Sequence, residues 1–339
     1  MSGERNVRLA LLGAAHLHAD AYAAALRTLP GVTLLGFSEP DPGRADRFAR
    51  ASGLNWRSQA ELLAERPGGV IVCAENARRL EPVRAAAAAG AHILCEKPIA
   101  TTLEDALEMR SACEAAGVSF VTAFPARFSR AAWGLREELV AGGVGEVLGY
   151  SGVNHSFCPD PEFPWFSDQT LAGGGAAMDH IVHLADLLRF LGERPTSVYA
   201  ALRPVPAWVR PEHAGVDAAG LVSLGLASGA CASIDCSWSR PPGYPRWGQL
   251  RLEVMGTGGM LGLDPFAEHL NLSGAGHSWA GYGDDLNRLL LQDFLALCRG
   301  AAPSGRAANW TDGYEALRVV LAAYASAASG MPVELPGEG

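Results

Sequence analysis

Along the first 124 residues, short apolar runs alternate with stretches that have the composition and spacing of helices. Near-continuous apolar runs predict strands buried on both faces, and their alternation with helices predicts a parallel sheet covered by helices. Gly90 and Gly117 stand where glycine commonly follows the last turn of a helix. The pattern indicates an α/β, doubly wound sheet with strands at 7–12, 33–38, 69–73, 92–95 and 119–122, and helices at 19–29, 43–52, 59–65, 80–89 and 103–116.

The pattern changes after Phe124, where successive strand-like runs replace the alternation. Strands in succession, flanked by helices, predict a second, α+β domain with an open, mostly antiparallel sheet. We therefore expect one domain over residues 1–124 and another over 125–339. In the second, the predicted helices are 135–141, 176–191, 285–299 and 312–328, the predicted strands are 147–155, 198–202, 220–226, 230–238, 249–255 and 260–263, and a proline- and aromatic-rich loop covers 158–166.

Composition narrows the class of protein. The 339 residues are 49% hydrophobic and 19% charged, as in globular domains, and the net charge of −9 disfavours nucleic acid or an anionic membrane as partner. No apolar run is long enough for a membrane span, and the first residues lack the apolar core of a secretory signal. The seven cysteines form no CxxC pair, so we expect a cytoplasmic protein.

The stretch "GAAHLHAD", residues 13–20, follows the first predicted strand. Gly13 allows a tight turn into a helix whose N-terminus offers N–H groups to a pyrophosphate. Ala15 and His18 stand where a dinucleotide-binding loop usually has glycines, which leaves two alternatives. One is an ordinary strand–helix turn, and the other is a metal site that uses His16 and His18.

Glu39 ends the second predicted strand, 26 residues after Gly13. An acidic side chain there accepts hydrogen bonds from an adenosine ribose, and it repels a 2′-phosphate, so NAD is favoured over NADP. Arg44 and Arg47 follow only one helical turn later. The alternative is a solvated acidic residue in a turn.

Glu96, Lys97 and Pro98 follow the fourth predicted strand, at the sheet edge where ligands bind in α/β folds. A lysine there hydrogen-bonds a substrate hydroxyl and shares in its deprotonation when burial lowers the lysine pKa. A surface Lys–Glu pair is the alternative.

Three glycines open the predicted helix 176–191, in which Asp179, His183 and Asp186 follow the spacing i, i+4, i+7. These side chains share one helical face, and a carboxylate one turn from a histidine suits a general base. The alternatives are a hydrogen-bonded core histidine or half of a metal site with His180. Zinc needs a third ligand, which no nearby motif supplies, so we expect no metal there.

Together these motifs resemble the glucose–fructose oxidoreductase / inositol dehydrogenase (Gfo/Idh/MocA) family over nearly the whole chain. The segments that carry the resemblance are "VIVCAENARRLEPVRAAAAAGAHILCEKPIATTLEDA", "FVTAFPARFS", "EELVAGGVGEV", "GGGAAMDHIVHLADLLRFLG", "EVMGTGGML" and "TDGYEALRVVLAAYASAASGMPVEL". The sequence departs from the family pattern at Ala15 and His18, in "AENARR" with its Glu75 and Arg79, and in the residues between His180 and His183.

The resemblance implies an NAD(P)-dependent dehydrogenase with an N-terminal Rossmann domain. Its substrate would be a secondary alcohol of a sugar, cyclitol or related polyol, and its subunits would form a homodimer or homotetramer. Lys97, Asp179 and His183 would be catalytic, with His183 or Lys97 taking the hydroxyl proton while hydride passes to nicotinamide. The residues expected to bind NAD are Gly13, Ala15, His16, His18, Glu39, Asn76, Glu96, Lys97 and Pro98, and those expected to bind substrate are Arg127, His155, Asp179 and His183.

Two other functions remain open. The altered glycine loop also fits a non-catalytic sensor or binding protein of the same fold. A metal-dependent hydrolase with His16 and His18 would require further ligands at later strand ends.

Overall fold

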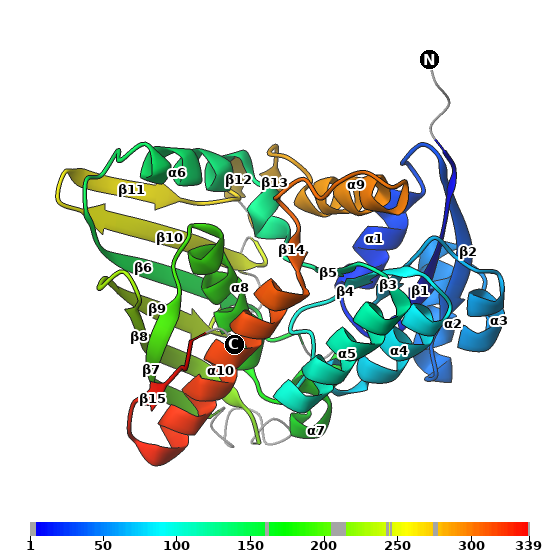
Figure 1. Ribbon diagram of the computed structural model, residues 1–339, viewed down its shortest axis with the longest axis horizontal. Coiled ribbons are helices and arrows are strands. Elements are labelled where there is room, and N and C mark those ends of the chain that lie inside the picture. The colour runs from blue at the N-terminus through cyan, green and yellow to red at the C-terminus, as the bar shows by residue number, and fades with distance from the viewer. Residues whose placement is uncertain are drawn as a thin grey trace. The chain divides into compact units, whose positions relative to one another are not determined.

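The computed structural model describes residues 5–159, 163–204, 215–241, 244, 246–273 and 277–337. The chain divides into two compact units, elements of which are labelled in Figure 1. Unit 1 comprises Met1–Pro125 and Asp285–Tyr314, and unit 2 comprises Ala126–Asp284 and Glu315–Gly339. Residues 160–162 of the predicted aromatic loop lie outside the described residues.

The sheet of unit 1 is parallel except at one edge. Its six strands follow the order β14-β5-β4-β3-β1-β2, and the chain reverses its direction of winding between β1 and β3. The predicted doubly wound Rossmann fold is thereby confirmed. The strands are β1 (Val7–Leu12), β2 (Val32–Ser38), β3 (Gly69–Val72), β4 (His92–Cys95), β5 (Phe120–Thr122) and the antiparallel β14 (Ala308–Asn309).

Helices connect these strands, and side chains fix where most of them begin. The Ser58 hydroxyl and the Glu61 carboxylate form a capping box at the start of α3, while Thr102 caps α5 through the peptide N–H of Asp105. Gly117 ends α5 in the left-handed conformation. The helices are α1 (His18–Leu26), α2 (Pro42–Ser52), α3 (Gln59–Ala64), α4 (Leu80–Ala88) and α5 (Leu103–Ala116), with a short 3₁₀ turn η1 (Asn76–Arg78) before α4.

Residues 285–314 pack with unit 1, whereas the sequence analysis assigned them to the second domain. Helix α9 (Leu286–Cys298) lies against α1, and a Cβ at Gly69 of β3 would come within 2.7 Å of Cys298 Sγ. Arg299 hydrogen-bonds the carbonyl oxygens of Arg5 and Pro30, each at 3.0 Å. The expectation of contiguous domains missed this return because a helix pattern does not indicate which sheet the helix covers.

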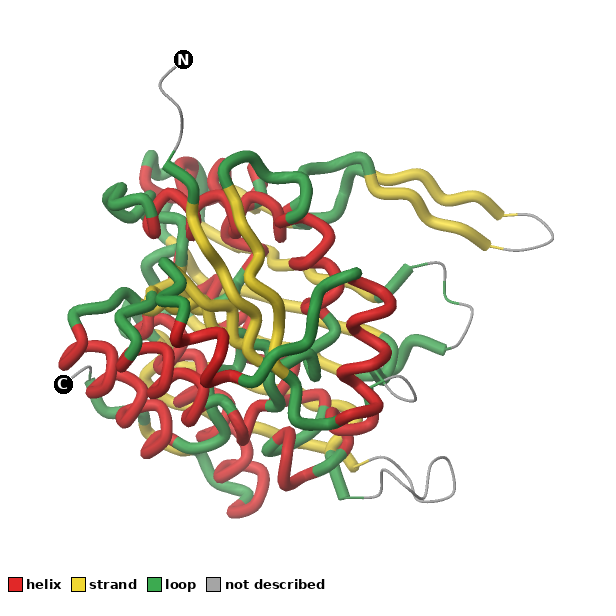
Figure 2. Tube along the Cα trace, turned by 90° about the vertical axis from the view of Figure 1, so that its right-hand side faces the viewer, coloured by secondary structure: helices red, strands yellow, loops and turns green. Residues whose placement is uncertain are grey.

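Among the described residues, the main sheet of unit 2 has seven strands in the order β11-β10-β6-β9-β8-β7-β15. Among the strand pairs that the structure describes, only β6 and β9 run parallel, which confirms a mostly antiparallel sheet. A hairpin that the sequence analysis did not predict, β12 (His269–Ser273) with β13 (His277–Gly281), extends away from this sheet (Figure 2). The main strands are β6 (Val147–Ser156), β7 (Pro195–Pro204), β8 (Asp217–Leu226), β9 (Cys231–Ser237), β10 (Gly248–Gly256), β11 (Gly259–Leu263) and β15 (Val333–Glu334).

One face of this sheet packs against α8 (Ala176–Phe190), which lies over β6, β8 and β9. Side chains alternate between the two faces of a sheet along each strand. Every second residue of these strands therefore faces α8, and the others point to the opposite face. That second face, called here the open face, carries the exposed side chains of Tyr199, Leu221, Met255 and Met260.

The other helices that the structure describes are α6 (Arg130–Val140), α7 (Gln169–Ala172) and α10 (Trp310–Ser329), with 3₁₀ turns η2 (Pro125–Phe128) and η3 (Pro164–Ser167). Among the described helices, none combines the length and the apolar character that crossing a bilayer requires.

Candidate active site

The loop between β1 and α1, residues 13–17, begins at the reversal point of the unit 1 sheet. Ligands of doubly wound proteins bind at such points, outside the carboxyl ends of the strands. Gly13 has φ of +87°, and a Cβ there would lie 2.5 Å from the backbone nitrogen of Ala74. Glycine is therefore required for the loop to pass this close to the segment that follows β3.

Three peptide N–H groups of the β1–α1 loop are hydrogen-bonded within unit 1. Ala14 donates to the Glu39 carboxylate at 2.8 Å, while Ala15 and His16 donate to the carbonyl oxygen of Cys73 at 3.1 and 2.9 Å. Glu39 is almost fully buried at the end of β2. The predicted ribose acceptor thus also anchors the loop.

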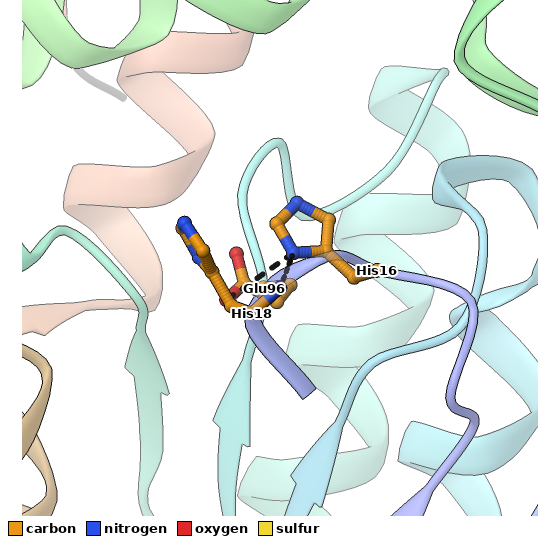
Figure 3. A group of neighbouring side chains, drawn as sticks. All are labelled: His16, His18 and Glu96. Carbon is orange, nitrogen blue, oxygen red and sulfur yellow. Dashed lines mark hydrogen bonds and ion pairs between the residues drawn. The ribbon is translucent and has the colours of Figure 1, made fainter. Parts of the chain in front are cut away.

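His16, His18 and Glu96 form a cluster beside this loop (Figure 3). His18 Nδ1 and the Tyr22 hydroxyl oxygen lie 2.8 and 2.6 Å from Glu96 Oε1, and His16 Nδ1 lies 3.6 Å from the same oxygen. The peptide N–H of His18 donates to His16 Nδ1 at 3.2 Å. The side chains of Glu96 and His16 are 0% and 1% exposed, whereas that of His18 is 22% exposed.

Burial and the contacts within the cluster together shift the pKa values of its members. Burial lowers the pKa of His16 well below the usual value, although the nearby Glu96 charge opposes the effect. Burial also favours neutral Glu96, but His16, His18 and the Tyr22 hydroxyl outweigh it and hold the pKa of Glu96 well below its usual range. The pKa of Tyr22 is raised well above its usual value by burial and by Glu96. At neutral pH, a protonated Tyr22 therefore faces an ionised Glu96.

Arg79 connects the segment after β3 to the turn that carries Lys97. Its side chain is fully buried, and Nε donates to the carbonyl oxygen of Ala74 at 3.0 Å. Nη1 donates to the carbonyl oxygens of Glu96, at 2.8 Å, and Pro98. The Lys97–Pro98 peptide bond is cis, and Lys97 is 4% exposed. Arg79 therefore helps to fix the backbone on both sides of Lys97.

Arg44 reaches the carboxylates of both Glu39 and Glu75. Its Nη2 lies 2.8 Å from Glu39 Oε1 and 2.6 Å from Glu75 Oε1, and the peptide N–H of Asp41 donates to Glu39 Oε1 at 2.9 Å. Although Arg44 follows Glu39 by one helical turn in sequence, its side chain folds back over the end of β2. The buried negative charge of Glu39 is thereby compensated.

In unit 2, two side chains from distant elements hold the N-terminus of α8. Asp217 of β8 accepts hydrogen bonds from the peptide N–H groups of Gly175, at 2.9 Å, and Ala177, at 2.6 Å. The Tyr324 hydroxyl of α10 donates to Asp217 at 2.5 Å and accepts from Gly175 and Met178 at 3.1 and 3.2 Å. Burial and Asp217 raise the pKa of Tyr324 well above its usual value, so the hydroxyl keeps its proton.

The glycines before α8 are required by this packing. A Cβ at Gly174 would lie 1.9 Å from the Tyr324 hydroxyl oxygen, and one at Gly175 would lie 2.0 Å from the carbonyl oxygen of Asp217. The Gly-Gly-Gly run therefore brings the helix start within hydrogen-bonding range of both partners.

Asp179, in the first turn of α8, contacts two aromatic side chains. Trp238 Nε1 donates to Asp179 Oδ2 at 3.3 Å, and His180 Nε2 lies 3.2 Å from the same oxygen. His180 Nε2 also lies 3.0 Å from the Ser156 hydroxyl, and the His180 carbonyl accepts from Asn154 at 3.2 Å. His183, one turn further along, is half-buried. The helix thus presents one carboxylate and two imidazoles within about one turn.

Comparison with known proteins identifies the family. Residues 7–124 match the model described as "Oxidoreductase family, NAD-binding Rossmann fold", and residues 134–262 match the "GFO/IDH/MocA C-terminal domain". The inositol 2-dehydrogenase of Acidothermus cellulolyticus is 30% identical to the chain over 271 residues, which cover 78% of this chain and 74% of that protein. The chain belongs to the Gfo/Idh/MocA family.

Similarity to this family extends along the whole chain. The scyllo-inositol 2-dehydrogenase (NAD(+)) of Bacillus subtilis is 29% identical, with 98% of this chain and 97% of that protein covered. The solved structure of GenD2 from gentamicin A biosynthesis, in complex with NAD, has the same fold, with a TM-score of 0.85 over 99% of this chain and 98% of that chain at 23% identity. The predicted family, the oxidoreductase class and the use of NAD are confirmed.

The structure places two of the predicted substrate residues away from Asp179. Arg127 is buried in η2, where Nε donates to Asp186 Oδ2 at 2.9 Å and Nη2 lies 2.7 Å from Asp186 Oδ1. His155 is on the open face, 3.0 Å from Asp235 and 3.1 Å from Arg240, whereas the neighbouring Asn154 faces α8. Their roles in this Gfo/Idh/MocA protein stay predictions, but Arg127 already has an ionic partner.

Several residues that organise the Gfo/Idh/MocA site were absent from the sequence-based predictions. Tyr22 could have been predicted from the sequence, because it lies one turn after His18 and therefore shares its helical face. Arg79 stood out only as a departure from the family pattern, and nothing in the sequence indicated its contacts. Asp217, Trp238 and Tyr324 belong to distant elements, and no local sequence pattern indicated that they contact α8.

Replacing Tyr324 with phenylalanine should lower the free energy of unfolding by about 2 kcal/mol, because one hydrogen bond to a buried carboxylate is lost and the Met178 N–H loses its acceptor. Urea unfolding would measure the loss. Tyr199→Phe is the matched control, since Tyr199 is 47% exposed and its variant should unfold as the wild type does. Equal stability of the two variants would contradict the proposed support of α8.

Proposed function

We propose that the protein catalyses the NAD-dependent oxidation of a secondary alcohol in a sugar, cyclitol or related polyol, or the reverse reduction. The observation that carries this proposal is the similarity, over 98% of this chain, to an NAD(+)-dependent scyllo-inositol dehydrogenase. The carboxylate and imidazoles of α8 support it, since such groups bind hydroxyls and accept protons.

In this proposal, Lys97, Asp179 and His183 are the acid–base groups. His183 or Lys97 takes the proton of the substrate hydroxyl, and Asp179 binds and orients the polyol. Lys97 is almost fully buried and its backbone is fixed by Arg79 and Glu96, which suits a side chain that must hold one position. Asp179 is positioned by Trp238 and by the capped start of α8.

The residues of unit 1 fit the adenosine end of NAD. Gly13 allows close approach at the reversal point of the sheet, and the buried Glu39 is the expected acceptor for ribose hydroxyls. NAD, when bound, supplies the hydride acceptor. Since the N–H groups of Ala14, Ala15 and His16 are hydrogen-bonded within the chain, we propose that the partly exposed side chain of His18 takes over part of the pyrophosphate contact.

Titration of the purified protein with NADH and with NADPH, followed by nicotinamide fluorescence, should give the lower Kd for NADH. Glu39→Ala should weaken NADH binding by about tenfold, because the ribose loses a charged hydrogen-bond acceptor. Glu253→Ala, an exposed position in unit 2, should leave the Kd unchanged. A panel of inositols and sugars with NAD⁺, monitored by NADH formation, then tests the substrate class.

Three outcomes would count against parts of this proposal. Preference for NADPH would reverse the role given to Glu39 and would point to Arg44 as a 2′-phosphate ligand. Binding of neither nucleotide would favour the sensor alternative. If the protein binds the nucleotide but oxidises no polyol of the panel, the proposed substrate class is wrong.

We also propose that the protein is a cytoplasmic homodimer or homotetramer that associates through the open face. The apolar side chains of Leu221, Met255 and Met260, exposed by 63%, 38% and 64%, support an interface there. Four cysteines are buried thiols, in keeping with a reducing compartment: Cys73, Cys95, Cys113 and Cys236.

A further inference from the structure

We propose that His16, His18 and Glu96 form a binding site for a divalent transition-metal ion of the zinc class, within unit 1 (Figure 3). The site does not depend on hydride transfer. It uses His18, which stands where a dinucleotide-binding loop usually has a glycine, and His16, which lies two residues before it. No third ligand for these histidines lies near them in the sequence. Glu96, 78 residues after His18, supplies it from the end of β4.

The ligand set is suited to such an ion. Two neutral imidazoles and one carboxylate, with a fourth position left for water or an anionic oxygen, are a combination that zinc uses in proteins. His16 Nδ1 accepts a hydrogen bond from the His18 N–H, so this nitrogen carries no proton, and on coordination its single lone pair would exchange that hydrogen bond for the ion. An unprotonated imidazole nitrogen is the form that coordinates a metal.

The distances between ligand atoms fit an ion at their centre. With metal–ligand bonds of about 2.0–2.2 Å, tetrahedral ligand atoms lie about 3.3–3.6 Å apart. Glu96 Oε1 is 2.8 Å from His18 Nδ1 and 3.6 Å from His16 Nδ1, and all three ligand atoms lie within 4.8 Å of one another. A small rotation of His18, which is the only partly exposed member of the three, opens the shorter distance.

Outer contacts hold the carboxylate in place. The Tyr22 hydroxyl donates to Glu96 Oε1 at 2.6 Å, and the Lys97 peptide N–H donates to Oε2 at 3.1 Å. Such contacts orient a metal ligand in advance. Arg79 places a positive charge next to the Glu96 backbone, and this charge repels a divalent cation. We therefore expect the site to bind the metal ion with micromolar rather than nanomolar affinity.

The test is a titration of metal-free protein, without a histidine tag, with Co²⁺ followed by visible absorption, and then with Zn²⁺ as competitor. Wild type should develop the absorption of tetrahedral Co²⁺ at one equivalent, and Zn²⁺ should remove it. His18→Ala should weaken Co²⁺ binding by at least about tenfold, since loss of even an outer contact has that effect at metal sites. His18→Cys keeps a ligand and should add a thiolate-to-cobalt band.

Matched controls distinguish Co²⁺ binding at this site from Co²⁺ binding at other histidines. They also distinguish metal binding from the proposed dehydrogenase function. His269→Ala, a variant of unit 2, should bind Co²⁺ as the wild type does. Circular dichroism of each variant shows whether it is folded. If His18→Ala loses Co²⁺ binding because it unfolds, the visible spectrum of His18→Cys tests the site instead. No Co²⁺ or Zn²⁺ binding by wild type, or equal binding by folded His18→Ala, would overturn the proposal. NADH titration is a separate readout, so either proposal can fail alone.

Discussion

Replacing His183 with glutamine lowers kcat for polyol oxidation by about 10²- to 10⁴-fold, the range that a general acid or base contributes. Glutamine keeps the size and polarity of the side chain but does not accept a proton at neutral pH. The position is half-buried on α8 of unit 2, whereas the proposed nucleotide ligands belong to unit 1, so the Kd for NADH should change little. Steady-state kinetics and a nucleotide titration measure the two effects.

The pH profile sharpens this test. If His183 is the base, the acidic limb of the kcat profile disappears in His183→Gln, whereas a histidine that only fills space would leave the limb in place. His269→Gln is the control and should keep the wild-type kcat. A normal kcat for His183→Gln would exclude the histidine as base and leave Lys97 as the proton acceptor, to be examined as Lys97→Met.

Replacing Arg127 with alanine lowers the free energy of unfolding by about 3–5 kcal/mol, since it leaves the carboxylate of Asp186 buried without its cation. The double variant Arg127→Met with Asp186→Leu should recover most of this loss, because no uncompensated charge remains. Urea unfolding measures both variants.

Arg130 offers a matched comparison, since it pairs with Asp284 at 3.0 Å but its side chain is 76% exposed. Arg130→Ala should lower the free energy of unfolding by less than about 1 kcal/mol. If Arg127→Ala instead keeps its stability and raises KM for the polyol, the substrate role predicted for Arg127 is right and the structural role is wrong.

Local patterns predicted unit 1 well because its elements are defined locally. The bounds of β1, β4 and α5 coincide with the predicted ones, since each strand is a continuous apolar run and α5 lies between a threonine cap and Gly117. Strands β14 and β15 have two residues each, β13 (HSWAG) does not alternate, and the alternation of β12 (HLNLS) extends over only five residues. Such short or polar strands are defined by their pairing partners, so the sequence pattern did not indicate them.

The residues of the candidate site also divide into those that local sequence patterns predict and those that they do not. Gly13, Glu39 and Glu96 were predictable because each stands at a fixed place relative to a strand end. The interaction of Glu96 with His16 and His18 was not, since 78 residues separate Glu96 from His18 and no local pattern reports the contact. The support of α8 by Asp217 and Tyr324 likewise depends on side chains that converge only after folding.

The return of residues 285–314 to unit 1 has a consequence for synthesis on the ribosome. Until that segment emerges, the nascent N-terminal region lacks the antiparallel partner of β5, and α1 lacks the apolar cover of α9. Although N-terminal domains commonly fold first during translation, this one reaches its native packing only after nearly all of unit 2 has been made. The packing of unit 1 is therefore completed late in translation, after most of unit 2 has left the ribosome.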